Sequence, residues 1–354
     1  MDIAIAIKEF PPDKIGGAET QTKRMASVLQ DRGHDITVFT KRYQQHDDSD
    51  VNYEVVRVPN WKPNSFLSDL TFLIGCFILL LRRKSEFDCL QCMMIYPIGF
   101  LGFVLHQLTG LPYFAWVRGN DFYVAKDIRW KRWMIRRVLS NTLVLVQSSE
   151  IESDVRDEFP DLDPEIDVLG NGVDIPPEPR MEPDDNKILF IGRFAPKKGL
   201  EYLFDAIEEI NVEAELILVG DGDNRELLEQ RAENVPLDVR FEGYVSPSEV
   251  DSYYREATVF ILPSIEGEGM PNVVLEAMAW GVPVITTDSG GLPSVIKDGK
   301  TGHLVPMRDS TALREAIEAL LNNTMERERI GRYSRKYVSQ NHSWEIQVDQ
   351  LENI

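Results

Sequence analysis

The sequence predicts an α/β fold made of two Rossmann-like, doubly wound domains that face a cleft. Strands alternate with helices in both halves of the chain, and a segment rich in proline and acid separates the halves. A length of 354 residues is also more than one hydrophobic core usually serves. We therefore expect an N-terminal domain at 1–169, a linker at 170–186, a second domain at 187–335, and a C-terminal helix at 336–354 that returns toward the first domain.

The first half opens with a strand–helix–strand unit. MDIAIAIKEF alternates apolar residues, the amphipathic segment GGAETQTKRMASVLQDRGH has a helix stop at Gly33, and DITVFT reads as the next strand. A helix between two strands is typical of a parallel sheet. SNTLVLVQSS at 140–149 is a further buried strand of this half.

The second half repeats the pattern after the proline-rich segment GNGVDIPPEPRMEPDDN. Strands are expected at KILFIGR, AELILVGDG, VRFEGY, TVFILPS, PVITTD and HLVP, and helices near 199–210, 224–234, 247–256 and 271–280. In such sheets, ligands bind at the carboxyl ends of the strands. The sequence contains neither GxGxxG after the first strand nor GxxxxGK[ST], which argues against a dinucleotide reductase and a P-loop enzyme.

Charge is divided unevenly along the chain. Residues 1–150 carry 19 Lys and Arg and 16 Asp and Glu, out of 38 and 58 in the whole chain. Residues 151–354 therefore carry 19 Lys and Arg and 42 Asp and Glu. A slightly basic half joined to a strongly acidic one indicates that one face meets anions.

Three cysteines, Cys76, Cys89 and Cys92, lie among apolar residues. With no signal peptide they suggest a reducing cytoplasm. Cys89 and Cys92 have CxxC spacing without a second ligand pair, so we expect buried thiols, with a metal or redox role as the alternative.

Two segments of the first half suggest a membrane surface. LTFLIGCFILLL at 70–81 spans only roughly 18 Å as a helix, against the roughly 30 Å of a hydrocarbon core, so 66–84 is expected to be buried or to dip into the interface. KDIRWKRWMIRR at 126–137 carries six basic residues and places Trp130, Trp133, Met134 and Arg137 on one helical face. This pattern suits an anionic membrane. The alternative is a solvated helix that packs its tryptophans inward.

The stretch EGEGMPNVVLEAMAWG at 266–281 predicts a sugar–phosphate site. Pro271 suits the first turn of a helix that follows a strand, so the amino end of the helix should lie at the edge of the sheet and favour phosphate. Glu268 precedes this helix and Glu276 lies inside it. Carboxylates near a phosphate are costly unless they meet hydroxyls, and a sugar–phosphate ligand provides both groups.

These residues resemble a known family. PSIEGEGMPNVVLEAMAWGVPVITTDSGG, FIGRFAPKKG, GGAE, GNGVD and the SW at 343–344 are similar to the retaining GT-B glycosyltransferases of the large family GT4, and the resemblance covers essentially the whole chain. It implies that Arg193 and Lys198 hold the donor diphosphate and neutralise the leaving group, without a metal or another cofactor. It also implies that Glu268 meets the sugar hydroxyls and Glu276 the ribose.

The same resemblance implies the remaining donor-binding residues, which are Gly16, Gly17, Gly269, Met270, Pro271 and Asn272. Plainer structural interpretations stay open for some of them. Lys198 could be a solvated lysine before a helix, Glu276 an exposed helix residue, and Gly16 and Gly17 a helix-entry turn.

On the acceptor side, the resemblance implicates Arg118, Asn120 and Asp121 in WVRGNDFY. Many members carry a histidine where this chain has Arg118, which cannot act as a base near neutral pH but could bind an acceptor phosphate. Asp121 is expected near donor sugar and acceptor, with an N-cap role as the alternative. Ser294 replaces a frequent acid, with a local effect only, and Asp48-Ser-Asp50 spells DxD but is not expected to bind metal.

Together these features predict a metal-independent, retaining hexosyl- or N-acetylhexosaminyl-transferase that uses a nucleotide-diphosphate sugar. The acceptor is expected to be lipid-linked or membrane-proximal, the protein cytoplasmic and peripheral at the inner face of the cell membrane, and nucleic acid no partner. The alternatives are a nucleotide-sugar 2-epimerase on the same fold and a non-catalytic sugar-nucleotide binding protein.

Overall fold

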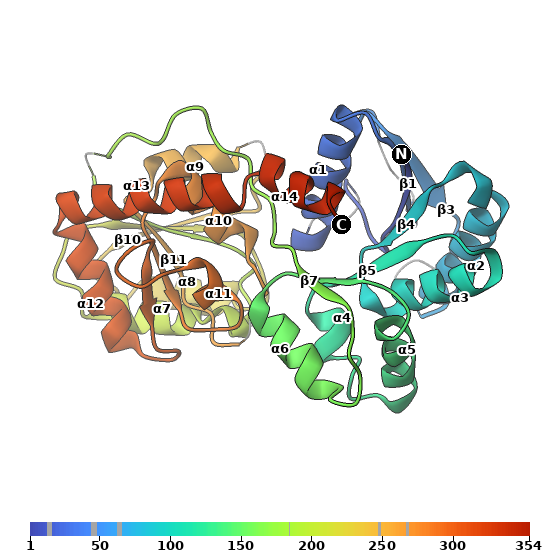
Figure 1. Ribbon diagram of the computed structural model, residues 1–354. Helices are drawn as coiled ribbons and strands as arrows, with labels where there is room; N and C mark the ends of the chain where they lie inside the picture. The colour runs from blue at the N-terminus through green and yellow to red at the C-terminus, as the bar shows by residue number, and fades with distance from the viewer. Residues whose placement is uncertain (13–15, 44–47, 62–65, 184, 247–248, 267–268) are drawn as a thin grey trace. The chain divides into compact units, whose positions relative to one another are not determined.

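The computed structural model describes residues 1–12, 16–43, 48–61, 66–183, 185–246, 249–266 and 269–354, with the side chains of Phe66 and Asn120 outside this description (Figure 1). The chain forms two compact units. The first comprises Met1–Asn171 with Gln347–Ile354, and the second Gly172–Ile346. The segment predicted as a linker, 170–186, thus belongs to the second unit from Gly172 onward.

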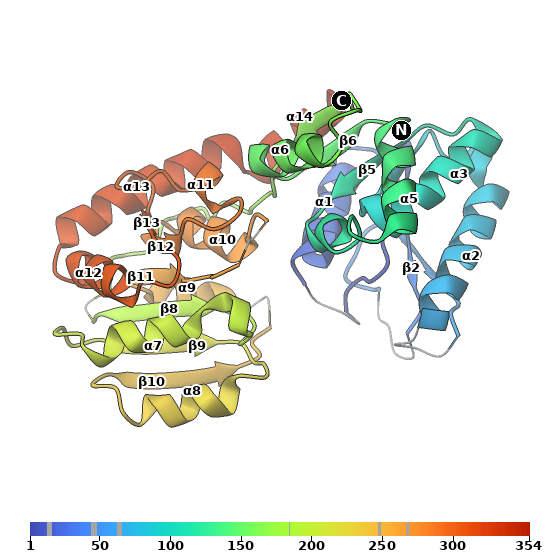
Figure 2. The ribbon, with the colours of Figure 1, turned by 90° about the horizontal axis from the view of Figure 1, so that it is seen from below.

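The first unit contains a seven-stranded sheet whose neighbouring strands all pair in parallel. In spatial order the strands are β3 (Glu54–Val58), β2 (Asp35–Lys41), β1 (Asp2–Ala6), β4 (Cys89–Cys92), β5 (Tyr113–Val117), β6 (Val144–Val146) and β7 (Ile166–Val168). Its longer helices are α1 (Gly17–Asp31), α2 (Phe66–Arg82), α3 (Phe100–Thr109), α5 (Arg129–Leu139) and α6 (Ser149–Glu158). Shorter helical segments are η1 (Lys84–Glu86), η2 (Ile95–Gly99) and α4 (Asn120–Tyr123). Figure 2 shows α1 on one face of this sheet and α2 and α3 on the other.

The second unit is built on a six-stranded parallel sheet. Its spatial order is β10 (Asp238–Gly243), β9 (Glu215–Val219), β8 (Lys187–Ile191), β11 (Val259–Leu262), β12 (Val284–Thr287) and β13 (His303–Val305). Its first helices are η3 (Pro196–Lys198), α7 (Leu200–Glu208), α8 (Arg225–Ala232), α9 (Val250–Glu256) and α10 (Asn272–Trp280). They are followed by α11 (Leu292–Val295), α12 (Ser310–Leu321) and α13 (Thr324–Asn341). Helices α7, α8 and α12 pack together, as do α9, α10 and α13.

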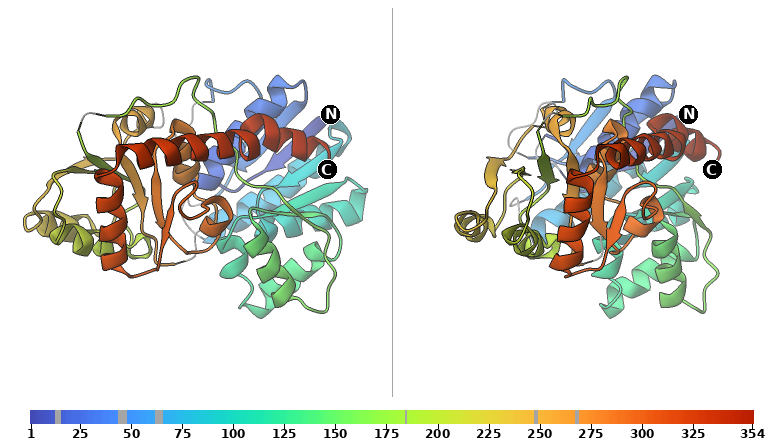
Figure 3. Two further views of the ribbon diagram at one scale, coloured as in Figure 1. Left: turned by 60° about the vertical axis from the view of Figure 1, so that its left-hand side comes forward. Right: turned by 90° about the vertical axis from the view of Figure 1, so that its left-hand side faces the viewer.

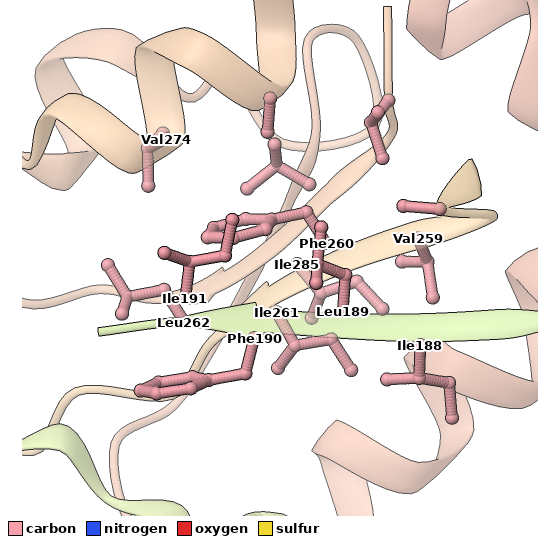
Figure 4. Close-up of a cluster of buried hydrophobic side chains, with 14 of the residues drawn as sticks. Ile188, Leu189, Phe190, Ile191, Val259, Phe260, Ile261, Leu262, Val274 and Ile285 are labelled. Atoms are coloured by element: carbon pink, nitrogen blue, oxygen red, sulfur yellow. The ribbon is translucent and has the colours of Figure 1, made fainter. Parts of the chain in front are cut away.

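The core of the second unit follows from the strand period of two. Along β8, Ile188 and Phe190 point to one side of the sheet and Leu189 and Ile191 to the other, where Val274 of α10 lies (Figure 4). All four strand residues are buried, because helices cover both faces of a parallel sheet.

The chain ends in two helices rather than in the single helix expected over 336–354 (Figure 3). α13 stops at Asn341 because the next backbone groups pair elsewhere: the N–H of Val173 donates to the carbonyl of His342 at 2.8 Å, and Val173 forms a bridge with Ser343. Helix α14 (Trp344–Glu352) then carries the chain into the first unit, where Glu352 pairs with Arg32 at 2.8 Å.

The three cysteines are free thiols. Cys76 and Cys92 are buried in the core of the first unit, and burial raises the pKa of Cys76 to about 12 and that of the half-buried Cys89 to about 11. Thiols held protonated in this way are poor metal ligands and poor nucleophiles.

Candidate functional site

Two loops are locked together at the carboxyl edge of the second unit's sheet, one after β8 and one after β11. Gly199 follows η3 with a left-handed backbone (φ 65°), and a Cβ placed on it would lie 2.0 Å from the carbonyl oxygen of Pro263. Only glycine tolerates both conditions. The N–H of Ile265 also donates to the carbonyl of Lys197 at 2.9 Å. The loop after β8 is thereby fixed against the loop that leads to α10.

The predicted cation pair lies on the first of these loops. Arg193 is exposed and comes two residues after β8, whereas Lys198 is half-buried and ends η3. Between them the N–H of Phe194 donates to the carbonyl of Asp221, after β9, at 2.8 Å. Backbone bonds to two neighbouring loops therefore position both cations at the sheet edge.

The predicted donor-binding residues 269–272 lie on the second loop, at the amino end of α10. α10 begins at Asn272 and Pro271 is its N-cap residue, one position earlier than the first-turn placement expected from sequence. Met270 is buried and Gly269 half-buried. Glu268 lies outside the described residues. A helix amino end at this edge favours an anionic ligand.

Glu276 lies one turn inside α10 and is not the exposed helix residue that sequence left open. The hydroxyl of the buried Tyr254, on α9, donates to its Oε2 at 2.8 Å. Burial raises the pKa of Glu276, the Tyr254 bond lowers it, and the charges of Asp251 and Asp174 raise it. Burial also raises the pKa of Tyr254 well above its ordinary value, so its hydroxyl stays a donor at working pH.

Two of the quoted motifs pack on one another within the second unit. A Cβ on Gly172 of GNGVD would lie 2.4 Å from the indole of Trp344, the tryptophan of SW. Glycine is needed here for close packing, since the ring occupies the side-chain position.

Gly16 and Gly17 form the start of α1. Gly16 is its N-cap residue with extended backbone, and a Cβ on it would lie 2.5 Å from a carboxylate oxygen of Glu19. The helix-entry alternative therefore describes their local structure. A diphosphate at this amino end would have to share it with the Glu19 carboxylate.

Asp121 is not the N-cap that was weighed as an alternative. It is the second residue of α4, and its two oxygens accept from the backbone N–H groups of Ile95 and Arg118, each at 2.9 Å. Burial raises its pKa to about 6, against the lowering effect of these two bonds. Asn120 begins α4, but its side chain lies outside the described residues.

Arg118 lies between β5 and α4, with its guanidinium over the ring of Trp116 at 4.0 Å. Its Nη1 donates to Oδ1 of Asn171 at 3.2 Å, an oxygen that also accepts from Gln147 at 2.7 Å. Burial lowers the pKa of Arg118 to about 10, although Asp121 and Glu19 raise it. A residue whose charged form is destabilised by burial in this way is a candidate for ligand binding.

The acids of the DxD spelling each bind a cation of the chain. Asp48 pairs with Arg57 at 2.5 Å, and Asp50 pairs with Lys23.

Helix α2 is apolar on two opposite faces. Phe72, Cys76 and Leu80 lie in the core. Five apolar residues, called here the α2 stripe, are 37% to 52% exposed: Leu67, Leu70, Ile74, Ile78 and Leu81. At about 100° per residue they fall within an arc of about 80°. Such a continuous exposed face marks an interaction surface.

Helix α5 supplies half-exposed aromatic residues and cations. Trp130 and Trp133 are 52% and 49% exposed, so the tryptophans are not packed fully inward. Three of the six basic residues in 126–137 pair with acids of the first unit: Lys126 and Arg132 with Glu158, and Arg136 with Asp161. The other three, called here the α5 cations, are Arg129, Lys131 and Arg137. In the described part of the chain, no helix has the length and apolar character that a membrane span requires.

Sequence reasoning missed the residues that orient the predicted ones. Tyr254 gave no signal because SYYRE reads as an ordinary amphipathic helix. Asn171 lies inside the quoted GNGVD motif, so its place in the motif could have indicated a role. Gln147 lies inside the segment predicted as a strand at 140–149 and directly follows β6, and nothing in its neighbours indicates the bond to Asn171.

Comparison with known proteins agrees with this geometry. The family model described as "Glycosyl transferases group 1" matches residues 174–337, and the model "Glycosyltransferase Family 4" matches residues 15–175. The two matches follow the division into two units.

A relative from Corynebacterium glutamicum, named GDP-mannose-dependent monoacylated alpha-(1-6)-phosphatidylinositol monomannoside mannosyltransferase, is 25% identical over 382 residues, 99% of this chain and 96% of its own. Among solved structures, sucrose-phosphate synthase from Thermosynechococcus elongatus superposes with a TM-score of 0.85 at 22% identity, covering 99% of this chain and 97% of that one. Anabaena Alr3699/HepE in complex with UDP-glucose superposes with a TM-score of 0.78 at 19% identity and covers both chains fully. This chain therefore belongs to the group 1 glycosyltransferases of family 4 and has their GT-B fold.

Proposed function

We propose that this glycosyltransferase moves a sugar, with retention of configuration, from a nucleotide-diphosphate sugar to a hydroxyl of a lipid-linked or membrane-proximal acceptor. The observation that carries the proposal is the pair of locked loops in the second unit. They hold the loop of Arg193 and Lys198 against the segment that leads into α10. Two cations and a helix amino end suit a diphosphate.

In the proposed reaction, the bond between the anomeric carbon and the phosphate oxygen breaks, and both electrons leave with the diphosphate. Arg193 and Lys198 stabilise the charge that develops on this leaving group, which is the task of a metal ion in other transferases. The acceptor oxygen bonds to the same face of the sugar, and its proton passes to the departing phosphate. Glu268 positions the sugar, and Glu276 accepts hydrogen bonds from the ribose.

The comparisons support the donor and acceptor classes. Anabaena HepE holds UDP-glucose, and the name of the Corynebacterium relative specifies GDP-mannose and a phosphatidylinositol mannoside. A nucleotide-diphosphate sugar is common to both, and the second name joins such a donor to a lipid acceptor.

The α2 stripe and the α5 cations support peripheral binding to an anionic membrane. An apolar face inserts into the acyl boundary while cations meet lipid headgroups. α3 packs against both α2 and α5, so the two features belong to one layer of the first unit. We place this surface at the inner face of the cell membrane.

The donor role is tested by transfer from a panel of nucleotide-diphosphate sugars to a lipid extract, in EDTA, with NMR assignment of the new anomeric linkage. Removing one group that stabilises the leaving charge costs on the order of 10²- to 10³-fold in kcat. We expect such losses for Arg193→Ala and Glu268→Gln, and the anomeric configuration of the donor in the product. Wild-type transfer by both variants, or an inverted linkage, would contradict the proposal.

The membrane role is tested by flotation with vesicles of phosphatidylcholine with and without phosphatidylglycerol. We expect binding that requires the anionic lipid at low salt and is lost in Ile74→Ser/Ile78→Ser. Leu227→Ser is the matched control, because Leu227 is 53% exposed on α8 of the second unit. Failure of the wild-type protein to float at low salt would remove the membrane role.

A further inference from the structure

Arg118, a half-buried residue whose Nε atom is out of contact with solvent, differs in its charge balance from the arginines whose side chains are buried in the described chain. Arg57, Arg180 and Arg327 each have a side chain no more than 6% exposed, and each is ion-paired with a carboxylate. No carboxylate in the described ranges forms an ion pair with Arg118. A cation that has lost much of its contact with water and has no paired anion is costly, so the exception calls for a cause.

The hydrogen bonds of Arg118 are also incomplete. A guanidinium has five N–H donors, and its single side-chain bond in the described structure goes to Oδ1 of Asn171, which is already bonded to Gln147. The Nε atom is buried and has no hydrogen-bond partner there. Several donors are thus oriented without an acceptor of their own.

Nearby acids do not remove this imbalance. Asp121 and Glu19 are close enough to favour the charged form of Arg118, but burial outweighs them and lowers its pKa. Both oxygens of Asp121 accept from backbone N–H groups rather than from the guanidinium. The site therefore gains stability from an added anion.

We propose that Arg118 binds a phosphate group of the acceptor, which makes the acceptor a phosphate-bearing molecule. The planar guanidinium presents paired N–H donors that match phosphate oxygens. The guanidinium of Arg118 lies over the ring of Trp116, and its Nη1 is held by the hydrogen bond to Asn171. Arg118 follows β5, at the carboxyl edge of the first unit's sheet, where ligands of such folds bind. The inference rests on the proposed transfer function for its acceptor, but binding can be measured without transfer.

The experiment measures inorganic phosphate binding by thermal shift and calorimetry in an Arg193→Gln/Lys198→Gln host, which weakens phosphate binding on the donor side. We expect phosphate to raise the Tm of this host, and the added change Arg118→Gln to weaken the apparent Kd at least tenfold. Adding Arg136→Gln instead is the matched control, since Arg136 lies on α5 and is paired with Asp161. An unchanged phosphate response in the Arg118→Gln host would overturn the proposal, as would an equal response of the starting host to acetate.

A second measurement separates binding from a structural role. Removing a charge that is partly desolvated and has no paired carboxylate in the described residues should leave the Tm of Arg118→Gln in phosphate-free buffer equal to or above that of the wild type. A lower Tm with an unaltered phosphate response would show a structural residue. If Arg118→Gln weakened nucleoside diphosphate binding as strongly as Arg193→Gln, the phosphate would be the donor's and the acceptor assignment would be wrong. Binding of the nucleotide-diphosphate sugar to the Arg193→Gln/Lys198→Gln host tests the proposed function. The effect of Arg118→Gln on phosphate binding is measured separately, so either result can fail without the other.

Discussion

The bond between Tyr254 and Glu276 gives the sharpest prediction about the donor side. Tyr254→Phe removes one hydroxyl from a buried site and leaves Oε2 of Glu276 without the donor that lies 2.8 Å away. The ring stays in place against Phe260, whose centroid lies 6.1 Å from that of Tyr254, so little packing changes. The same hydroxyl also lies 3.3 Å from the carbonyl oxygen of Val273, but the contact with the Glu276 carboxylate is shorter, so the variant reports mainly on that bond.

A hydrogen bond to a charged acceptor contributes about 1.5–3 kcal/mol, and one between neutral groups about 0.5–1.5 kcal/mol. The bond lowers the pKa of Glu276, so its loss raises that pKa beyond the increase that burial already causes. A carboxyl whose pKa is higher in the folded state makes its stabilising contribution at low pH and loses it as the pH rises through that pKa. The stability penalty of Tyr254→Phe should thus be largest where Glu276 is ionised and should shrink in acid.

The assay is the pH dependence of kcat/KM for the donor, together with thermal unfolding at several pH values. If ionised Glu276 accepts the ribose hydroxyls, the acidic limb moves to higher pH and the donor KM rises roughly tenfold, which corresponds to about 1.4 kcal/mol. Tyr337→Phe is the control, since the Tyr337 hydroxyl donates to the carbonyl of Ser294 at 3.3 Å in the same unit. Superimposable pH profiles for Tyr254→Phe and wild type would refute the reasoning.

Three further changes test other parts of the structure. Gly199→Ala should destabilise the second unit by more than about 2 kcal/mol and abolish donor binding, because the alanine Cβ would overlap the carbonyl oxygen of Pro263. A Tm equal to that of the wild type would contradict this. Gly172→Ala should lower the Tm through its overlap with Trp344 while the secondary structure seen by circular dichroism remains. Asp121→Asn should remove a pH dependence of stability on the order of 2–3 kcal/mol, because burial raises the pKa of Asp121 to about 6. As the pH rises from 4 to 6, the stability of the wild type should fall relative to that of the variant. Parallel curves of Tm against pH for the two proteins would exclude this.

Most strands and helices of the fold could be predicted from the spacing of apolar residues along the sequence. The alternation in MDIAIAIKEF and KILFIGR predicted β1 and β8, and the apolar run at 66–84 predicted a helix found at Phe66–Arg82. β3 and β7 were not predicted. Residues of β3 are mostly half-buried, and β7 has only three residues, so neither gives the continuous apolar signal of a central strand.

The site was less accessible to sequence reasoning, because long-range contacts decide it. The resemblance named Glu276 and Asp121, but their ionisation depends on Tyr254 and Ile95, which lie 22 and 26 residues away along the chain. The exposure of the α2 stripe likewise depends on which face of the helix packs inward. An all-apolar helix leaves that choice open to the neighbouring elements.

The most direct measurement is calorimetric binding of nucleotide-diphosphate sugars to the wild type and to Arg193→Gln/Lys198→Gln, with the matching unphosphorylated nucleosides beside them. If the locked loops of the second unit grip the diphosphate, one donor of the panel binds the wild type, its affinity falls at least a hundredfold in the double variant, and the weak binding of its nucleoside is unchanged. Equal affinities of the two proteins for that donor would contradict the central claim.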